Sequence, residues 1–108
     1  MTVKELSQMQ GFSAVAMPEG DREISGIYIG DLLSWVMGRA KADNAWITIM
    51  SNINIVAVAS LADVACIILA EGVELDQSVK DTAEAKGVNI LTADMPAYET
   101  AMMIGSEL

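Results

Sequence analysis

The sequence predicts a single α/β domain whose mainly parallel sheet is covered by helices in βα alternation. Three observations support this prediction. The chain has 108 residues, the usual size of one domain, and 53% of them are hydrophobic, which is enough to build a core. From residue 45 onward, strand-like segments alternate with segments of helical spacing. Residues 66–70 are continuously apolar, which is typical of a parallel strand buried on both faces.

The N-terminal part of the chain predicts a short helix followed by two strands. Residues 2–10 form the expected helix, because Thr2 can act as its N-cap and Glu5 stands at the reciprocal capping-box position. An apolar run over residues 12–17 has the length of a strand and ends at a Pro-Glu-Gly sequence. The alternating pattern of residues 24–29 predicts the second strand.

The next predicted unit is a helix over residues 32–42 and a strand over residues 45–50. Asp31 precedes the helix and is expected to cap it through its side chain. The apolar stripe of this helix consists of Leu32, Leu33, Val36, Met37 and Ala40. Trp35 lies off the stripe, on the polar side. An aromatic residue in that position indicates either a partner surface or a side chain covered by a neighbouring loop.

Residues 55–64 are compatible with two structures. Their β-branched residues favour a strand. Their apolar spacing also fits a helix, with Ala57, Leu61 and Val64 on one face and Asn54 at the cap.

The last third of the chain predicts strand, helix, strand and helix. The buried strand ends at a Glu-Gly pair. A helix follows over residues 76–86, with Asp76 as its N-cap and Gly87 as its C-terminal stop. A strand over residues 88–92 then precedes a final helix, which Pro96 opens and which continues to the C-terminus.

The net charge of the chain disfavours some classes of binding partner. Fifteen Asp and Glu residues outnumber six Lys and Arg residues, and the formal net charge is −9. This charge repels nucleic-acid backbones and anionic membranes, so we expect neither as a partner. No apolar stretch reaches the roughly 20 residues of a membrane helix, and no signal-peptide pattern is present, so the cytoplasm is the expected location.

The residue types present exclude several kinds of chemistry. The chain has no histidine and one cysteine, Cys66, which excludes an internal disulfide, a Cys/His zinc site within one chain and a His-based triad. Neither GxxxxGK[ST] nor a GxGxxG motif after a strand is present. We expect no cofactor, no metal and no catalytic residue, and an enzyme is disfavoured. Cys66 lies within the apolar strand, where a thiol is inert and has a raised pKa.

Candidate ligand-binding residues follow the predicted parallel strands, because ligands of α/β sheets bind beyond the carboxyl ends of the strands. These candidates are Ser51, Asn52, Asn54, Glu71, Gly72, Thr92 and Asp94. The same residue types often serve only turns and caps. The carboxylates from Glu71 to Asp76 match no calcium loop, and Asp76 and Asp94 fit helix caps better than a metal site.

Three exposed-looking apolar residues are candidates for an interface. They are Trp35 on the polar side of its helix, and Met102 and Met103 in the C-terminal helix. Together with the apolar composition, they favour a homodimer or a complex with another protein.

The segment CIILAEGVELDQSVKDTAEAKGVNILTADMPAYETAMMI, residues 66–104, resembles the DRTGG-domain family. In that family a buried strand ends in a Gly turn, and a helix, a short strand and a terminal helix follow. Upstream residues from about 24 are similar to the rest of such domains. The resemblance therefore implies one DRTGG-like domain over residues 1–108 and favours a helix at residues 55–64.

Domains of this kind occur beside CBS pairs and in phosphotransacetylase-like chains, and they resemble the N-terminal domain of HPr kinase/phosphorylase. The sequence departs from the motif that names the family. Asn52-Ile53 stands in place of Asp-Arg, and Ala70-Glu71-Gly72 stands in place of Thr-Gly-Gly. This departure weakens the expectation of a ligand bound by the family's charged pair and favours an interaction role.

These observations predict a non-catalytic regulatory or protein-interaction module, with sensing of a small ligand as one role. One alternative is an accessory subunit of a serine-kinase-like or metabolic enzyme complex. Another is a small carboxylate-dependent enzyme, which requires Glu71, Asp94 and Asn52 to meet in one closed pocket.

Overall fold

The computed structural model describes residues 1–108 and contains one five-stranded sheet in the order β1-β5-β4-β3-β2. The strands are β1 (Phe12–Ala16), β2 (Gly26–Ile29), β3 (Asn44–Thr48), β4 (Cys66–Leu69) and β5 (Ile90–Ala93). Strands β2 to β5 are parallel, and β1 pairs antiparallel with β5 at one edge. The predicted α/β class with a mainly parallel sheet is confirmed.

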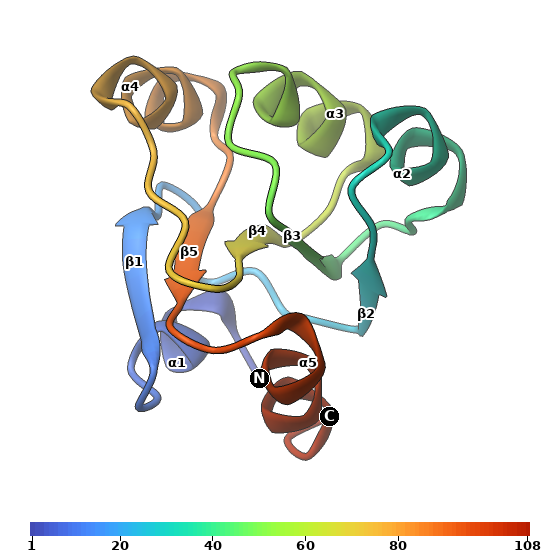
Figure 1. The fold of residues 1–108 in the computed structure, drawn as a ribbon, viewed down its shortest axis with the longest axis vertical. Coiled ribbons are helices and arrows are strands. Elements are labelled where there is room, and N and C mark those ends of the chain that lie inside the picture. The colour runs from blue at the N-terminus through green and yellow to red at the C-terminus, as the bar shows by residue number, and fades with distance from the viewer.

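Five helices cover the two faces of the sheet. They are α1 (Val3–Ser7), α2 (Leu33–Arg39), α3 (Asn54–Ala62), α4 (Gln77–Lys86) and α5 (Ala97–Gly105). Helices α2, α3 and α4 cover one face, and α1 and α5 cover the other (Figure 1). None of these helices has the length and apolarity needed to cross a membrane.

The core consists of two layers separated by the sheet. Strands β3 and β4 are buried at every position, because helices lie on both of their faces. Trp46 is the largest fully buried side chain, and its indole Nε1–H donates to the carbonyl of Gly30 at 2.9 Å. This bond satisfies the one polar atom of a residue that otherwise packs among apolar groups.

Several local expectations are confirmed. The Glu5 N–H donates to Thr2 Oγ1 at 3.1 Å, and the Thr2 N–H donates to Glu5 Oε1 at 2.8 Å, which completes the capping box. The hydrogen bonds from Thr2 lower the pKa of Glu5. Gly87 ends α4 with a φ of 72°. The ambiguous segment forms α3, so the strand alternative is wrong.

The expected side-chain caps of three helices are wrong. The carboxylate of Asp31 accepts instead from Thr48 Oγ1 at 2.8 Å and from the Ile49 N–H at 3.0 Å, so it fastens the end of β3 rather than capping α2. Asp76 stands at the N-cap of α4 but makes no capping bond. Asn54 is the first residue of α3 and does not cap it.

Helix α2 is shorter than predicted and buries less of its stripe. It ends at Arg39 rather than at residue 42. Leu32 and Met37 are 57% and 47% exposed, and Val36 is the one fully buried residue of the helix. The helix lies at the β2 edge of the sheet, with α3 as its neighbouring helix on one side (Figure 1).

Arg22, Asp43 and Asp63 form a charged clamp at the end of the sheet where the parallel strands begin. Arg22 Nη2 lies 2.7 Å from Asp43 Oδ1, and Arg22 Nη1 lies 3.1 Å from Asp63 Oδ1. Burial alone would lower the pKa of Arg22, but the two carboxylates raise it above its ordinary value. The clamp ties the connection between β1 and β2 to the residues that precede β3 and β4.

Candidate functional site

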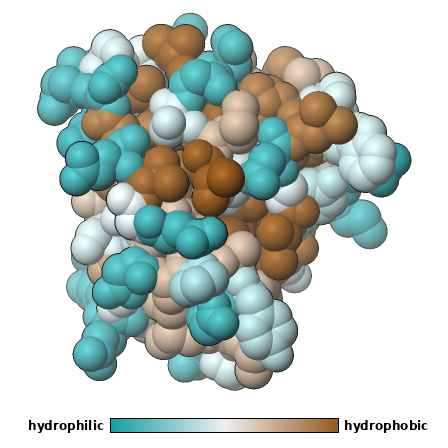
Figure 2. All heavy atoms as spheres, in the orientation of Figure 1, coloured by the Kyte–Doolittle hydropathy of each residue, from teal (hydrophilic) through white to brown (hydrophobic).

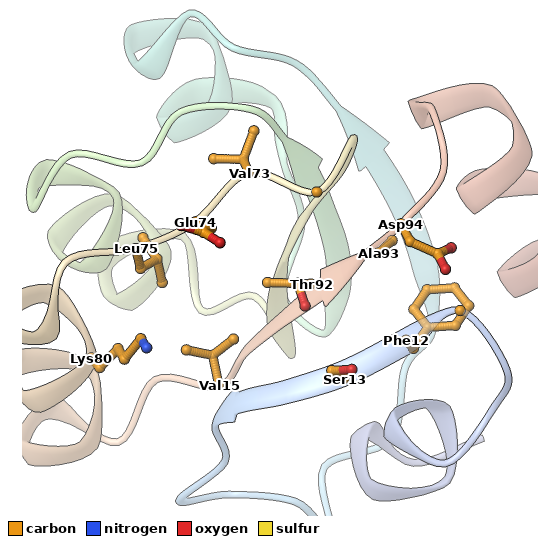
Figure 3. Close-up of a pocket in the computed structure, with 12 residues that line it drawn as sticks. Phe12, Ser13, Val15, Val73, Glu74, Leu75, Lys80, Thr92, Ala93 and Asp94 are labelled. Carbon is orange, nitrogen blue, oxygen red and sulfur yellow. The ribbon is translucent and has the colours of Figure 1, made fainter.

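The largest of three surface hollows lies at the β1–β5 end of the sheet and has a volume of about 550 Å³. Its floor is the sheet face of β1 and β5, and its wall is the segment from β4 to α4 (Figure 3). Ser13 of β1 pairs in register with Thr92 of β5, so their hydroxyl groups are neighbours on the floor. Ser13 is exposed and Thr92 is half-buried.

A tight turn after β4 positions the wall of the hollow. The Val73 N–H donates to the carbonyl of Ala70 at 3.3 Å, and Glu71 and Gly72 between them have φ values of 60° and 69°. Two central residues with positive φ define a type I′ turn. The Glu71 and Gly72 N–H groups also donate to the carbonyls of Met95 and Ala93, which ties the turn to the end of β5.

A glycine closes the other end of the hollow. Gly11 precedes β1 with a φ of 93°, and its carbonyl accepts from the Asp94 N–H at 3.0 Å. A Cβ at Gly11 would lie 2.6 Å from Met95 Cε, which would have to shift, and 3.0 Å from Asp94 Oδ1, and the φ of Gly11 is one that other residues rarely adopt. The glycine therefore permits the close approach that brings Asp94 to the rim of the hollow.

Comparison with known proteins identifies the family. The model of the DRTGG domain family matches residues 7–106. The chain belongs to the DRTGG domain family. No curated protein matches it.

Solved structures include a chain with the same fold as this DRTGG domain. It contains the CBS and DRTGG domains of the regulatory region of Clostridium perfringens pyrophosphatase, in complex with the activator diadenosine tetraphosphate. The TM-score is 0.76 and the sequence identity is 11%, over 99% of the present chain and 47% of the pyrophosphatase chain. The present chain thus spans about half of that regulatory region.

The structure does not bring all the predicted site residues together. Gly72, Thr92 and Asp94 line the hollow. Glu71 belongs to the adjoining turn, and its side chain is exposed. The remaining three candidates, Ser51, Asn52 and Asn54, lie in and beside the loop from β3 to α3 and do not line it.

The position that corresponds to the family's charged pair has a local role here. Asn52 Oδ1 accepts from the Asn54 N–H at 2.9 Å, and the Asn52 carbonyl accepts from the Ile55 N–H at 3.2 Å. Asn52 therefore shapes the turn that enters α3, as short polar side chains commonly do in loops.

The carboxylates do not gather into one site. No group of three His, Cys, Asp or Glu residues is arranged to hold a metal ion. Of Glu71, Asp94 and Asn52, Asp94 alone lines the hollow. The convergence that a carboxylate-dependent enzyme requires is thus absent. Asp94 is also not the cap of α5, whose N-cap is Pro96.

Sequence reasoning missed Ser13 and Lys80, which line the hollow from β1 and α4. Ser13 carries no signal in the sequence, because its position depends on the antiparallel pairing of β1 with β5. Lys80 is one turn inside α4, and helical spacing alone does not show which neighbour that turn faces. Glu74, which lines the wall, belongs to the acidic cluster that the sequence did single out.

Cys66 is fully buried in β4, as expected, and burial raises the pKa of its thiol to about 12. The thiolate is the reactive form of cysteine. The side chain therefore acts here as a small apolar group of the layer beneath the sheet.

The candidate interface residues do not form one surface. Trp35 on α2 is 52% exposed, and the guanidinium carbon of Arg39 lies 3.7 Å from its ring centroid. Met102 on α5 is 56% exposed, but on the opposite face of the sheet. Met103 is half-buried in the lower core layer, so its expected exposure is wrong.

Proposed function

We propose that this DRTGG domain is a non-catalytic regulatory module that binds a small polar ligand in the hollow between β1, β5 and the β4–α4 segment. The observation that carries the proposal is membership of the DRTGG family, together with the fold shared with a regulatory region. That region is described in complex with a nucleotide activator. The hollow of about 550 Å³ falls within the usual size range of small-molecule sites, roughly 300–1,000 Å³.

The construction of the hollow suits a regulatory role. Its residues come from β1, the β4–α4 segment, α4 and β5, so a ligand would bridge parts of the chain that are far apart in sequence. The segment of residues 70–76 contains a turn but no helix or strand. A ligand held between Lys80 and Thr92 would restrain this segment, and a linked domain would detect the change.

Ligand binding is tested by thermal unfolding in the presence of nucleotides, amino acids and sugars, because a ligand that binds the native state raises the melting temperature. The Thr92→Val variant removes the floor hydroxyl at constant volume, and we expect it to weaken any binding detected. The Ser78→Ala variant, on an exposed position of α4, is the control and should bind as the wild type does. Equal binding by both variants would place the ligand elsewhere and contradict the proposal.

We further propose that the module is a cytoplasmic homodimer that associates along the β2 edge beneath α2. Residues 26–40 carry one acid, Asp31, and one base, Arg39, so their formal charge is zero while the whole chain carries −9. Two copies repel each other least when they meet through this neutral segment. The half-buried β2 residues and Trp35 supply apolar area at this edge. Figure 2 shows hydrophobic side chains toward the α2–α3 side and hydrophilic ones along the α4 side.

Size-exclusion chromatography with light scattering tests the dimer. The wild-type chain should have twice the monomer mass at high micromolar concentration, and Trp35→Glu should have the monomer mass. Tyr98→Glu is the matched control, since Tyr98 is an aromatic residue of α5 that is 68% exposed. A wild-type monomer, or a dimer unaffected by Trp35→Glu, would contradict the proposed edge. Fractionation of cells that express the tagged chain tests the location.

A further inference from the structure

None of the polar side chains that line the hollow makes a hydrogen bond or an ion pair within the protein. The five are Ser13, Glu74, Lys80, Thr92 and Asp94. The three ion pairs of the structure involve the Met1 amino group and Arg22, and none involves the hollow. By contrast, Asp31, which follows β2, and Asn52, in the loop after β3, both accept hydrogen bonds within the protein through their side-chain oxygens. The side chains of the hollow are therefore free to bind a ligand.

The charges of the hollow are separated along its length. Lys80 lies at the α4 end, beside Val15 and Leu75 (Figure 3). Asp94 lies at the opposite end, and Glu74 lies between the two on the wall. The hydroxyl of Thr92 is on the floor between the charged ends. A ligand that spans the hollow would thus meet one ammonium group at one end and carboxylates over the rest of its length.

The balance of charge selects among ligand classes. One Lys against two carboxylates gives the hollow a formal charge of −1, within a chain of −9. A polyphosphate would bring several negative charges against the two carboxylates, and the field of the chain would oppose its approach. A ligand with cationic groups alone would leave the ammonium of Lys80 without a partner in the hollow. A ligand with one charge of each sign pairs every charged end.

We propose that the hollow binds a small zwitterion of the class of short peptides with free ends, whose ammonium and carboxylate are far enough apart to reach both charged ends. The ligand carboxylate pairs with Lys80, the ligand ammonium pairs with Asp94, and the hydroxyls of Ser13 and Thr92 hydrogen-bond to polar atoms between them. This inference rests on the proposed ligand-sensing function and adds the ligand class to it. Charge-assisted hydrogen bonds of this kind are the strong ones in proteins, so both ends contribute to affinity.

The test is titration calorimetry of the full chain with unblocked dipeptides and tripeptides. Each probe is compared with its N-acetylated and its C-amidated form, and with ATP as the anionic probe. We expect at least one unblocked probe to bind saturably. Blocking either end should weaken it about 10-fold or more, because each block removes one charge-assisted pair. ATP should bind more weakly than the unblocked probe.

Variants of Lys80 and Asp94 test separately the contact at each charged end of the hollow. Lys80→Gln should weaken the unblocked probe about 10-fold but barely change the affinity of its C-amidated form. Asp94→Asn should likewise weaken binding of the unblocked probe but barely change the affinity of its N-acetylated form. Lys86→Gln, on the same helix but outside the hollow, is the control and should bind as the wild type does. Lys80→Glu should lose the zwitterion and gain affinity for putrescine, a diamine.

The outcomes distinguish the ligand class from the function. If ATP or a blocked probe binds best and Lys80→Gln weakens it, the zwitterion proposal is wrong and the ligand-sensing function stands. If the unblocked probe binds equally to Lys80→Gln, Asp94→Asn and Lys86→Gln, the proposed contacts are wrong. If none of the probes binds at millimolar concentration, the zwitterion proposal is overturned. If the wider thermal screen is also negative, the ligand-sensing function fails with it.

Discussion

At the scale of single residues, Glu71 has a conformation that suits glycine better. Its φ of 60° lies in the left-handed region, at the position where the family's naming motif has a glycine. This conformation destabilises the folded state by roughly 1–2 kcal/mol for a residue with a Cβ. Glycine avoids that strain, but its greater freedom in the unfolded chain offsets about 0.4–1 kcal/mol of the gain. We therefore expect Glu71→Gly to raise the free energy of unfolding in urea by about 0.5–1 kcal/mol. Glu71→Ala, which keeps the Cβ, is the control. Equal stability of the two variants would contradict the argument.

Cys66 makes stability depend on alkaline pH. Its folded pKa of about 12 lies above the ordinary value of a thiol, so the folded state keeps its proton at pH values where the unfolded state releases it. The stabilisation is complete below the unfolded pKa, near 8.5, and is lost as pH rises toward 12. Between these values the loss approaches about 1.4 kcal/mol per pH unit. Denaturant unfolding between pH 8 and 11 should show this slope in the wild type, relative to Cys66→Ala. Parallel curves for the two proteins would refute it.

At the scale of elements, Asp31 couples the ends of two strands. It follows β2, and its carboxylate accepts from the buried Thr48 hydroxyl and from the Ile49 N–H at the end of β3. We expect Asp31→Ala to lower the free energy of unfolding by about 1–3 kcal/mol, because it leaves a buried hydroxyl without its acceptor. Asp31→Asn retains an acceptor oxygen and should recover most of the loss. Urea unfolding measures both variants, and equal losses would indicate that the bonds to Thr48 and Ile49 are not the cause.

The sequence predicted the elements well where the signals are local. The capping box at Thr2 and the glycine after α4 each depend on neighbours within four residues, and both are confirmed. The side-chain cap expected of Asp31 failed because a tertiary partner, the end of β3, competes for the same carboxylate. The antiparallel pairing of β1 with β5 was also beyond prediction, since nothing near residues 12–16 specifies a partner far along the chain.

The candidate site was predicted in part for the same reason. The rule that ligands bind beyond the carboxyl ends of parallel strands selects Gly72, Thr92 and Asp94, which line the hollow. The same rule also selects Asn52, whose side-chain oxygen already accepts a hydrogen bond from the Asn54 N–H in its own turn. It does not find Ser13, which reaches the site only through β1.

At the scale of the whole molecule, the surplus of negative charge works against the folded state. Fifteen acids face six bases, and Arg22 and the Met1 amino group supply all three ion pairs. Added salt screens the repulsion over distances longer than about 10 Å at 0.1 M. We expect the melting temperature to rise between low salt and about 0.5 M NaCl, where the Debye length is only a few Å. Scanning calorimetry measures this shift, and a fall in melting temperature would mean that the Arg22 clamp outweighs the repulsion.

The partnership of β1 with β5 has a consequence for how the chain folds. β1 lies near the N-terminus, and its only strand partner, Ile90–Ala93, lies near the C-terminus. During synthesis β1 emerges before the other four strands, and it has no strand to pair with until β5 has also left the ribosome. The floor of the hollow, which β1 and β5 form, is therefore completed after β2, β3 and β4 have paired with one another. Contacts between such distant segments slow folding, because a long loop must close before they form.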